Sequence, residues 1–236
     1  MNLTILSTDT PHHRFFFQKI NQSFNINNLV FETNIHKPKF DITSPFSNEE
    51  NQFEKENFFK DVPNSLPDCN VISFPSLNSI ECLTFLDEIE SDVGIVFGTG
   101  KLSSDVIEKF SMYLMNIHRG IPQFYRGLDS DLWAIEHGDF NNIGTTIHLV
   151  EPELDTGEIV GQSTLKIDKK MKIFHLRYHT TIIATDLVLK ALDSIKKGNL
   201  KTTPQHRRGE YFSFMPAAKK NEAARKFSNY CLTLGT

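Results

Sequence analysis

The chain has 236 residues, 39% of them hydrophobic and 20 of them phenylalanine, which fits one large domain or one domain with a short appendage. No stretch approaches 18 consecutive apolar residues, so we expect no membrane span, and the formal net charge of −4 argues against a nucleic-acid partner, which usually selects a basic face. The three cysteines, Cys69, Cys82 and Cys231, match no zinc spacing. We therefore expect free thiols, no metal site and a reducing cytoplasmic location.

The first half of the chain alternates short apolar segments with helical patterns. Its opening segment lacks the basic flank and the length of a signal peptide, so we expect a strand there. The pattern predicts strands and helices in this order: strand 3–7, helix 11–21, strand 29–32, strand 71–74, helix 79–89, strand 93–97 and helix 103–110. Residues 36–67 show no clean period, and a loop of this length predicts either an ordered insertion or a mobile lid.

The second half predicts one long helix and an antiparallel pair of strands. The expected elements are strand 112–117, a helical turn at 132–137, strands 145–150 and 158–167, and helix 173–196. Strands that alternate with helices indicate an α/β fold, with a Rossmann-like, mostly parallel sheet flanked by helices. We expect this domain over 1–200 and a polar tail over 201–236. The aromatic cluster 211–214 predicts a β-hairpin with a dimer contact, or a segment that folds back onto the domain.

Three segments that follow predicted strands carry groups suited to acyl transfer. Asn116 and His118 are two residues apart on one strand, so their side chains point to the same side. Asp155 lies in the turn between the two edge strands, and the segment 122–127 closes over the same strand end. An asparagine amide can donate to an oxyanion, and histidine transfers protons near neutral pH. The aspartate can orient the histidine, hold its charged form or take a proton through a water. Each signal is common when taken alone.

Together these segments resemble the folate-dependent formyltransferase family. The runs that carry the resemblance keep their order and spacing: 97–102, 115–118, 125–127, 133–135, 144–148 and 154–159. The resemblance implies the formyltransferase fold, with N10-formyltetrahydrofolate as formyl donor and Asn116, His118 and Asp155 as catalytic residues. It also implies direct attack of a substrate amine on the formyl carbon, with His118 or Asp155 as proton acceptor. The implied folate contacts are Phe97, Gly98, Gly100, Lys101, Leu102, Leu154 and Asp155.

The acceptor is harder to predict from the same resemblance. Residues after 201 are too few for the extra C-terminal domain of methionyl-tRNA formyltransferases. The turn at 7–14 lacks the glycines of glycinamide ribonucleotide formyltransferases, and the family's usual His-Pro-Ser reads His118-Arg119-Gly120. The run 8–14 is similar to sugar N-formyltransferases of surface-polysaccharide (O-antigen) pathways. This similarity implies a nucleotide-linked amino sugar, of the dTDP-4-amino-4,6-dideoxyglucose type, as acceptor, and a homodimer.

Several residues keep two interpretations. His12, His13 and Arg14 either hold a diphosphate or begin a helix, and Arg126 either contacts phosphate or holds its own turn. His148 is either structural or a support for Asp155. The basic residues after 218 are expected on a solvated helix face: Lys219, Lys220, Arg225 and Lys226. The competing functions are glycinamide ribonucleotide formylation, release of formate by hydrolysis, and folate binding without turnover.

Overall fold

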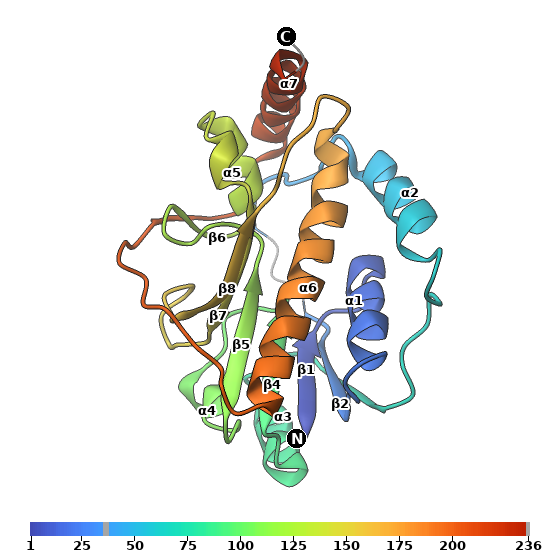
Figure 1. Cartoon of the computed structure of the whole chain (residues 1–236), viewed down its shortest axis with the longest axis vertical. Coiled ribbons are helices and arrows are strands. Elements are labelled where there is room, and N and C mark those ends of the chain that lie inside the picture. The colour runs from blue at the N-terminus through green and yellow to red at the C-terminus, as the bar shows by residue number, and fades with distance from the viewer. Residues whose placement is uncertain (35–37, 235–236) are drawn as a thin grey trace.

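The computed structural model describes residues 1–34 and 38–234 and is built on one twisted sheet of seven strands (Figure 1). The strand order is β3-β2-β1-β4-β5-β7-β8, parallel from β3 to β5 and antiparallel at β7 and β8. The strands are β1 Leu3–Ser7, β2 Asn28–Glu32, β3 Asn70–Phe74, β4 Val93–Phe97, β5 Tyr113–His118, β7 Gly144–Leu149 and β8 Ile159–Thr164. The predicted mostly parallel, Rossmann-like sheet is confirmed.

Helices cover both faces of this sheet, which explains why its central strands are apolar on both sides. On one face, Leu3 and Ile5 pack with residues of α1 and α6, and on the other face Leu6 packs with residues of α3 and α4. The helices are α1 Pro11–Asn21, α2 Ser47–Phe58, α3 Ile80–Ile89, α4 Ser104–Ile107, α5 Ser130–Glu136, α6 Leu176–Lys196 and α7 Ala217–Thr233, with 3-10 turns η1 Phe140–Asn142 and η2 Ile173–His175. In the described residues no helix is both long and apolar enough to cross a membrane.

The region predicted as an insertion or a lid contributes the helix α2. Its residues 36 and 37 lie outside the described part, and the helix α2 packs against α1 and α6 (Figure 1). Phe58 at the end of α2 is buried, and its ring stacks on Phe15 of α1 with centroids 4.6 Å apart. Aromatic packing of this kind fixes α2 beside the sheet.

The C-terminal segment differs from the predicted hairpin. Strand β9 (Glu210–Phe212) pairs in parallel with β6 (Tyr125–Gly127), whereas the strands of a hairpin are antiparallel. The tail therefore folds back onto the domain, and α7 then packs against α5. Lys220 was expected in solvent but is 7% exposed, because its ammonium donates to the Ile42 carbonyl and pairs with Asp129.

Candidate active site

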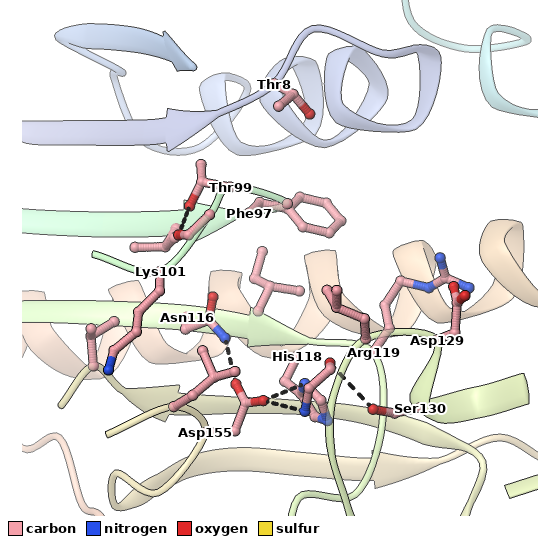
Figure 2. A pocket seen from close by; sticks show the side chains of 18 of the residues that line it. Thr8, Phe97, Thr99, Lys101, Asn116, His118, Arg119, Asp129, Ser130 and Asp155 are labelled. Carbon is pink, nitrogen blue, oxygen red and sulfur yellow. Dashed lines mark hydrogen bonds and ion pairs between the residues drawn. The ribbon is translucent and has the colours of Figure 1, made fainter. Parts of the chain in front are cut away.

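A cavity of about 490 Å³ opens at the carboxyl ends of β1, β4 and β5, where ligands of open α/β sheets bind. Its wall combines the loops after these strands with the start of α5, the loop before β8, and Arg177 of α6. Figure 2 shows Lys101 on one side of Asn116 and His118, and Arg119 and Asp129 on the other. The site is therefore assembled from segments distant in the sequence.

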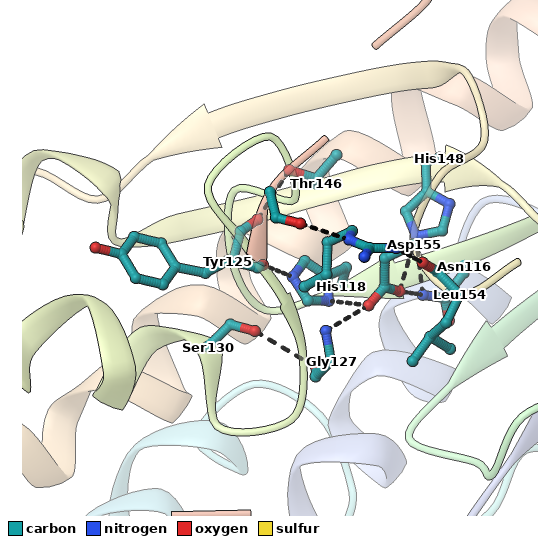
Figure 3. Close-up of polar contacts among 12 residues, drawn as sticks. Asn116, His118, Tyr125, Gly127, Ser130, Thr146, His148, Leu154 and Asp155 are labelled. Atoms are coloured by element: carbon teal, nitrogen blue, oxygen red, sulfur yellow. Dashed lines mark hydrogen bonds and ion pairs between the residues drawn. The ribbon is translucent and has the colours of Figure 1, made fainter. Parts of the chain in front are cut away.

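Asn116, His118 and Asp155 meet in this cavity, as the strand pattern predicts (Figure 3). Asp155 Oδ2 lies 3.5 Å from His118 Nδ1, and Asp155 Oδ1 lies 3.5 Å from Asn116 Nδ2. The Gly127 backbone N–H donates to Asp155 Oδ2 at 2.8 Å, so the carboxylate is held from two directions. His118 and Asp155 are only 4% and 5% exposed, which strengthens every electrostatic interaction between them.

The tautomer of His118 follows from its second contact. His118 Nε2 lies 2.9 Å from the Tyr125 carbonyl oxygen, which can only accept, so Nε2 carries the proton. In the neutral ring Nδ1 is then unprotonated, and it is the nitrogen that faces Asp155. When Nδ1 takes a proton, its N–H points toward the carboxylate. This arrangement prepares His118 Nδ1 to accept a proton inside the cavity.

His148 completes the cluster from β7. Its Nδ1 donates to the Leu149 carbonyl at 2.7 Å, which leaves Nε2 to accept from the Asn116 amide at 3.1 Å. The same Nε2 lies 3.4 Å from Asp155 Oδ1. The sequence allows His148 to be either a structural ring or a support for Asp155. Because this buried ring contacts both Asn116 and Asp155, the contacts favour the second interpretation.

Burial and charge set the protonation of the cluster. Burial lowers the pKa of His118 below its ordinary value, and the neighbouring Asp155 charge only partly opposes this. Burial alone would raise the pKa of Asp155, but the charges that His118 and His148 carry when protonated, the hydrogen bond that a protonated His148 donates, and the Gly127 N–H lower it to about 2. Near neutral pH the site therefore pairs a neutral imidazole with a carboxylate.

The residues predicted to contact folate all line the cavity: Phe97, Gly98, Gly100, Lys101, Leu102, Leu154 and Asp155. Gly98 has φ +76°, and a Cβ there would lie 2.8 Å from the His13 ring, so only glycine fits without strain. The Gly100 backbone N–H donates to Glu32 Oε2 at 2.6 Å and fixes the loop to β2. The main chain of this loop is thereby fixed in the cavity wall that also holds Asn116 and His118.

The four residues predicted to bind the acceptor divide into two groups. His12 and His13 line the cavity, whereas Arg14 and Arg126 do not. Arg14 makes a bidentate pair with Asp9 on the surface. Arg126 donates to the Gly209 and Leu154 carbonyls, which supports the interpretation that it holds its own turn.

The two cavity histidines carry little positive charge. Burial lowers the pKa of His12 well below its ordinary value and lowers that of His13 to about 3. The run 12–14 therefore places neutral rings, not cations, against the cavity. A diphosphate would find no charge on these two rings near neutral pH.

Sequence comparison places the chain in a known family. The family described as Formyl transferase matches residues 25–188, more than half of the chain and the part that carries Asn116, His118 and Asp155. The chain belongs to the formyl transferase family. It is similar to the methionyl-tRNA formyltransferases of Finegoldia magna (29% identity; 54% of this chain, 41% of the relative) and Thermotoga maritima (30% identity; 65% and 48%). The chain spans about half the length of these curated relatives.

Solved structures show the same fold at low sequence identity. A sugar N-formyltransferase from Shewanella sp. FDAARGOS_354 matches with a TM-score of 0.64, 14% identity, and coverage of 96% of this chain and 87% of that one. HypX from Aquifex aeolicus in complex with tetrahydrofolic acid matches with a TM-score of 0.60 and 18% identity. The match covers 97% of this chain and 34% of HypX. The formyltransferase PseJ from Anoxybacillus kamchatkensis was solved in complex with UDP-4,6-dideoxy-4-formamido-L-AltNAc and tetrahydrofolate. It matches with a TM-score of 0.54 and 17% identity, over 90% of this chain and 86% of PseJ.

The structure adds to the cavity charged residues that the sequence patterns missed. Arg119 lines the cavity and donates to Asp131 at 2.5 Å and to Thr180 at 3.2 Å. Arg177 of α6 also lines it, and its guanidinium makes a bidentate pair with Glu54 of α2. No sequence signal joins residues so far apart, because α2 lacks a clear amphipathic period.

Within residues 1–34 and 38–234, no group of three or more histidine, cysteine or acidic side chains is arranged to hold a metal ion. The amide, imidazole and carboxylate of the site can donate a hydrogen bond to an oxyanion, transfer a proton and stabilise a charge.

Proposed function

We propose that this chain transfers the formyl group of N10-formyltetrahydrofolate to the primary amine of a nucleotide-linked amino sugar. The observation that carries the proposal is the convergence of Asn116, His118 and Asp155 around one point of a buried cavity. Membership of the formyl transferase family supports the group transferred. The cytoplasmic location and the homodimer stay predictions.

The donor side of the cavity suits a folate. The loop 98–102, which contains Gly98 and Gly100, presents backbone N–H and C=O groups to the cavity. The buried Leu102 offers an apolar contact for the flat pterin ring of a folate. Lys101, at the outer edge of the same loop, is exposed and suits the carboxylates of a folate's glutamate tail. HypX and PseJ, two proteins of the same fold, were each solved with tetrahydrofolate or tetrahydrofolic acid.

The catalytic residues divide the work of one acyl transfer. As the amine nitrogen attacks the formyl carbon, negative charge grows on the formyl oxygen, and the Asn116 amide donates to it. The attacking nitrogen acquires positive charge, and His118 Nδ1 takes its proton. Asp155 stabilises the imidazolium that forms, since it faces this nitrogen. His118 then returns the proton to N10 as the carbon–N10 bond breaks, which leaves a formamide and tetrahydrofolate.

The acceptor side suits a sugar more than a phosphate. Thr8, Thr10 and Ser130 contribute hydroxyls to the wall. The two arginines of this wall, Arg119 and Arg177, are already paired with the acidic side chains of Asp131 and Glu54. Hydroxyl groups in the wall match the hydroxyl groups of an amino sugar. We therefore place the sugar in the cavity and the diphosphate toward its mouth.

The sequence relatives favour a second candidate acceptor. Methionyl-tRNA formyltransferases are about 30% identical to this chain over the shared region. The amine of an aminoacyl-tRNA would undergo the same chemistry at the same three residues. The two candidates differ in what lies outside the cavity, so substrate assays separate them.

The proposal is tested by an acceptor-dependent assay of tetrahydrofolate release. Purified protein is incubated with N10-formyltetrahydrofolate and a panel of dTDP- and UDP-linked amino sugars, with methionyl-tRNA, glycinamide ribonucleotide and no acceptor as the other arms. We expect release only with an amino-sugar nucleotide, and loss of release in the His118→Asn variant. Tetrahydrofolate release only with methionyl-tRNA, or only with glycinamide ribonucleotide, would identify that compound as the acceptor and contradict the amino-sugar proposal. Release without acceptor would indicate a hydrolase, and folate binding without release in any arm would indicate a non-catalytic relative.

A further inference from the structure

A C-terminal segment, residues 202–210, lies against the loop that carries Asp155. Ile159 and Thr203 exchange two backbone hydrogen bonds of 2.8 Å, which dock the segment at the end of the loop. The side chain of Gln205 then reaches the loop itself, where its Nε2 donates to the Asp155 carbonyl at 3.1 Å and to the Gly157 carbonyl at 2.7 Å. One amide group thus bridges the backbone on both sides of Thr156.

The Asp155 loop needs such support because of its backbone conformation. Asp155 has φ +55°, a left-handed conformation that a residue with a Cβ adopts at a cost in free energy. The direction of its carboxylate, toward His118 and the Gly127 N–H, depends on that conformation. A loop that relaxed to an ordinary φ would turn the carboxylate away from both partners.

The same segment also holds the turn 122–127, whose Tyr125 carbonyl contacts His118. The Gly209 N–H donates to the Pro122 carbonyl at 3.1 Å, and the Gly209 carbonyl accepts from Arg126 Nε at 2.8 Å. A Cβ at Gly209 would lie 2.4 Å from the Pro122 carbonyl oxygen, so glycine is required for this close approach. Arg126 in turn donates to the Leu154 carbonyl. The segment therefore links the turn that binds His118 to the loop that carries Asp155.

We propose that Gln205 is a positioning residue for formyl transfer, holding the loop so that the Asp155 carboxylate faces His118. The effect of Gln205 on formyl transfer rests on the proposed function. Its effect on the position of Asp155 does not, because that position can be measured in the ligand-free protein. Gln205 does not line the cavity, so it acts only through Asp155.

The kinetic test compares Gln205→Ala and Gln205→Glu with the wild type and with a matched control. Gln18→Ala is the control, because Gln18 Nε2 also donates to a backbone carbonyl, that of Ser65, away from the cavity. We expect kcat to fall about 10- to 100-fold in both Gln205 variants, with the acceptor KM changed less than about 3-fold, because a misplaced catalytic group slows the chemical step. Glutamate does not rescue, since a carboxylate cannot donate to the two carbonyls. Wild-type kcat in Gln205→Ala would overturn the proposal.

A second readout needs no substrate. The imidazole of His118 is titrated by NMR in ligand-free protein, where Asp155 and Asp131 raise its pKa and His148 lowers it. In Gln205→Ala the carboxylate of Asp155 is less well placed, so we expect the His118 pKa to fall, whereas Gln18→Ala leaves it unchanged. A shifted titration without turnover on any acceptor would contradict the proposed function and keep the positioning role. Measurable turnover with an unshifted titration and unchanged kcat would contradict the positioning role alone.

Discussion

The protonation state of one ring determines how the site works at the scale of single residues. His118 is neutral near pH 7 because burial lowers its pKa, and the Tyr125 carbonyl fixes its proton on Nε2. The free nitrogen faces the Asp155 carboxylate. In the proposed reaction, His118 therefore accepts the amine proton, and Asp155 stabilises the charge that results.

This assignment predicts the pH dependence of transfer. Protonation of His118 removes the base, so kcat/KM should fall on the acid side with an apparent pKa below the ordinary histidine value of about 6.5. In Asp155→Asn the charge that raises the His118 pKa is lost, so the acid limb should move to lower pH while kcat falls about 100-fold or more. Rate profiles of wild type and variant measure both effects. An acid limb that moves to higher pH in the variant would contradict the assignment.

The sequence predicted part of this residue-level arrangement. Strand periodicity alone places Asn116 and His118 on one side of β5, and both line the cavity. The contacts of His148 were not predictable in the same way, since they depend on the antiparallel register that sets His148 opposite Asn116. For Arg14 and Arg126 the sequence left a phosphate contact and a local structural role both open, because their partners Asp9 and Gly209 became visible only in the fold.

At the scale of elements, α2 is fastened to α6 by a buried ion pair. Glu54 is fully buried and Glu50 is partly buried, and both contact the Arg177 guanidinium, with Arg177 Nη1 3.0 Å from Glu50 Oε2. Burial raises the pKa of Glu50 despite this partner. Because Arg177 also lines the cavity, α2 helps to set the shape of the acceptor side.

Removal of the arginine should leave the buried Glu54 and the partly buried Glu50 without their partner. We expect Arg177→Met to lower the free energy of unfolding by about 3 to 5 kcal/mol, measured by chemical denaturation. Lys190→Met is the control: Lys190 forms an exposed pair with Asp186 on the same helix, and its loss should cost less than about 1 kcal/mol. Equal effects in the two variants would show that the Arg177 pair does not fasten α2.

The elements themselves were predicted to different degrees. Central strands and the long helix α6 carry strong periodic patterns, and they lie close to the expected positions. The helix α2 was not predicted, because it lacks a clear amphipathic period and is held by contacts with residues distant in the sequence. Phe53 stacks on His175 with ring centroids 4.1 Å apart, and Glu54 pairs with Arg177. For the segment of β9 the sequence left two interpretations, a hairpin or a segment that folds back onto the domain, because its partner β6 is distant in sequence; the structure shows the second.

At the scale of the whole molecule, the fold buries histidines in the neutral state between the sheet and α1. Burial, assisted by the charges of Arg177 and Arg119, lowers the pKa of His13 from about 6.5 to about 3. Its Nδ1 donates to the Thr8 carbonyl at 2.8 Å, which accounts for the ring's place at the start of α1. The unfolded chain binds a proton at His13 that the folded chain excludes.

This burial should make the protein lose stability in acid. A folded pKa below the unfolded value means that the contribution of His13 is complete above pH 6.5 and decreases as the pH falls toward 3. The slope for one such group is about 1.4 kcal/mol per pH unit. Denaturation of the wild type between pH 7 and 4 should show this loss, and His13→Asn, which keeps a donor but cannot titrate, should show a shallower dependence. An unchanged slope in the variant would exclude His13 as a source.

The central claim, that Asn116, His118 and Asp155 form a formyl-transfer site, is tested most directly by following the formyl carbon itself. N10-formyltetrahydrofolate labelled with ¹³C at the formyl group is mixed with the protein and an amino-sugar nucleotide, and the label is observed by NMR. The account predicts that the label appears as a formamide on the acceptor nitrogen, only when the acceptor is present, and that His118→Asn abolishes it. Label that appears as free formate without acceptor, or a formamide signal that persists in His118→Asn, would contradict the account.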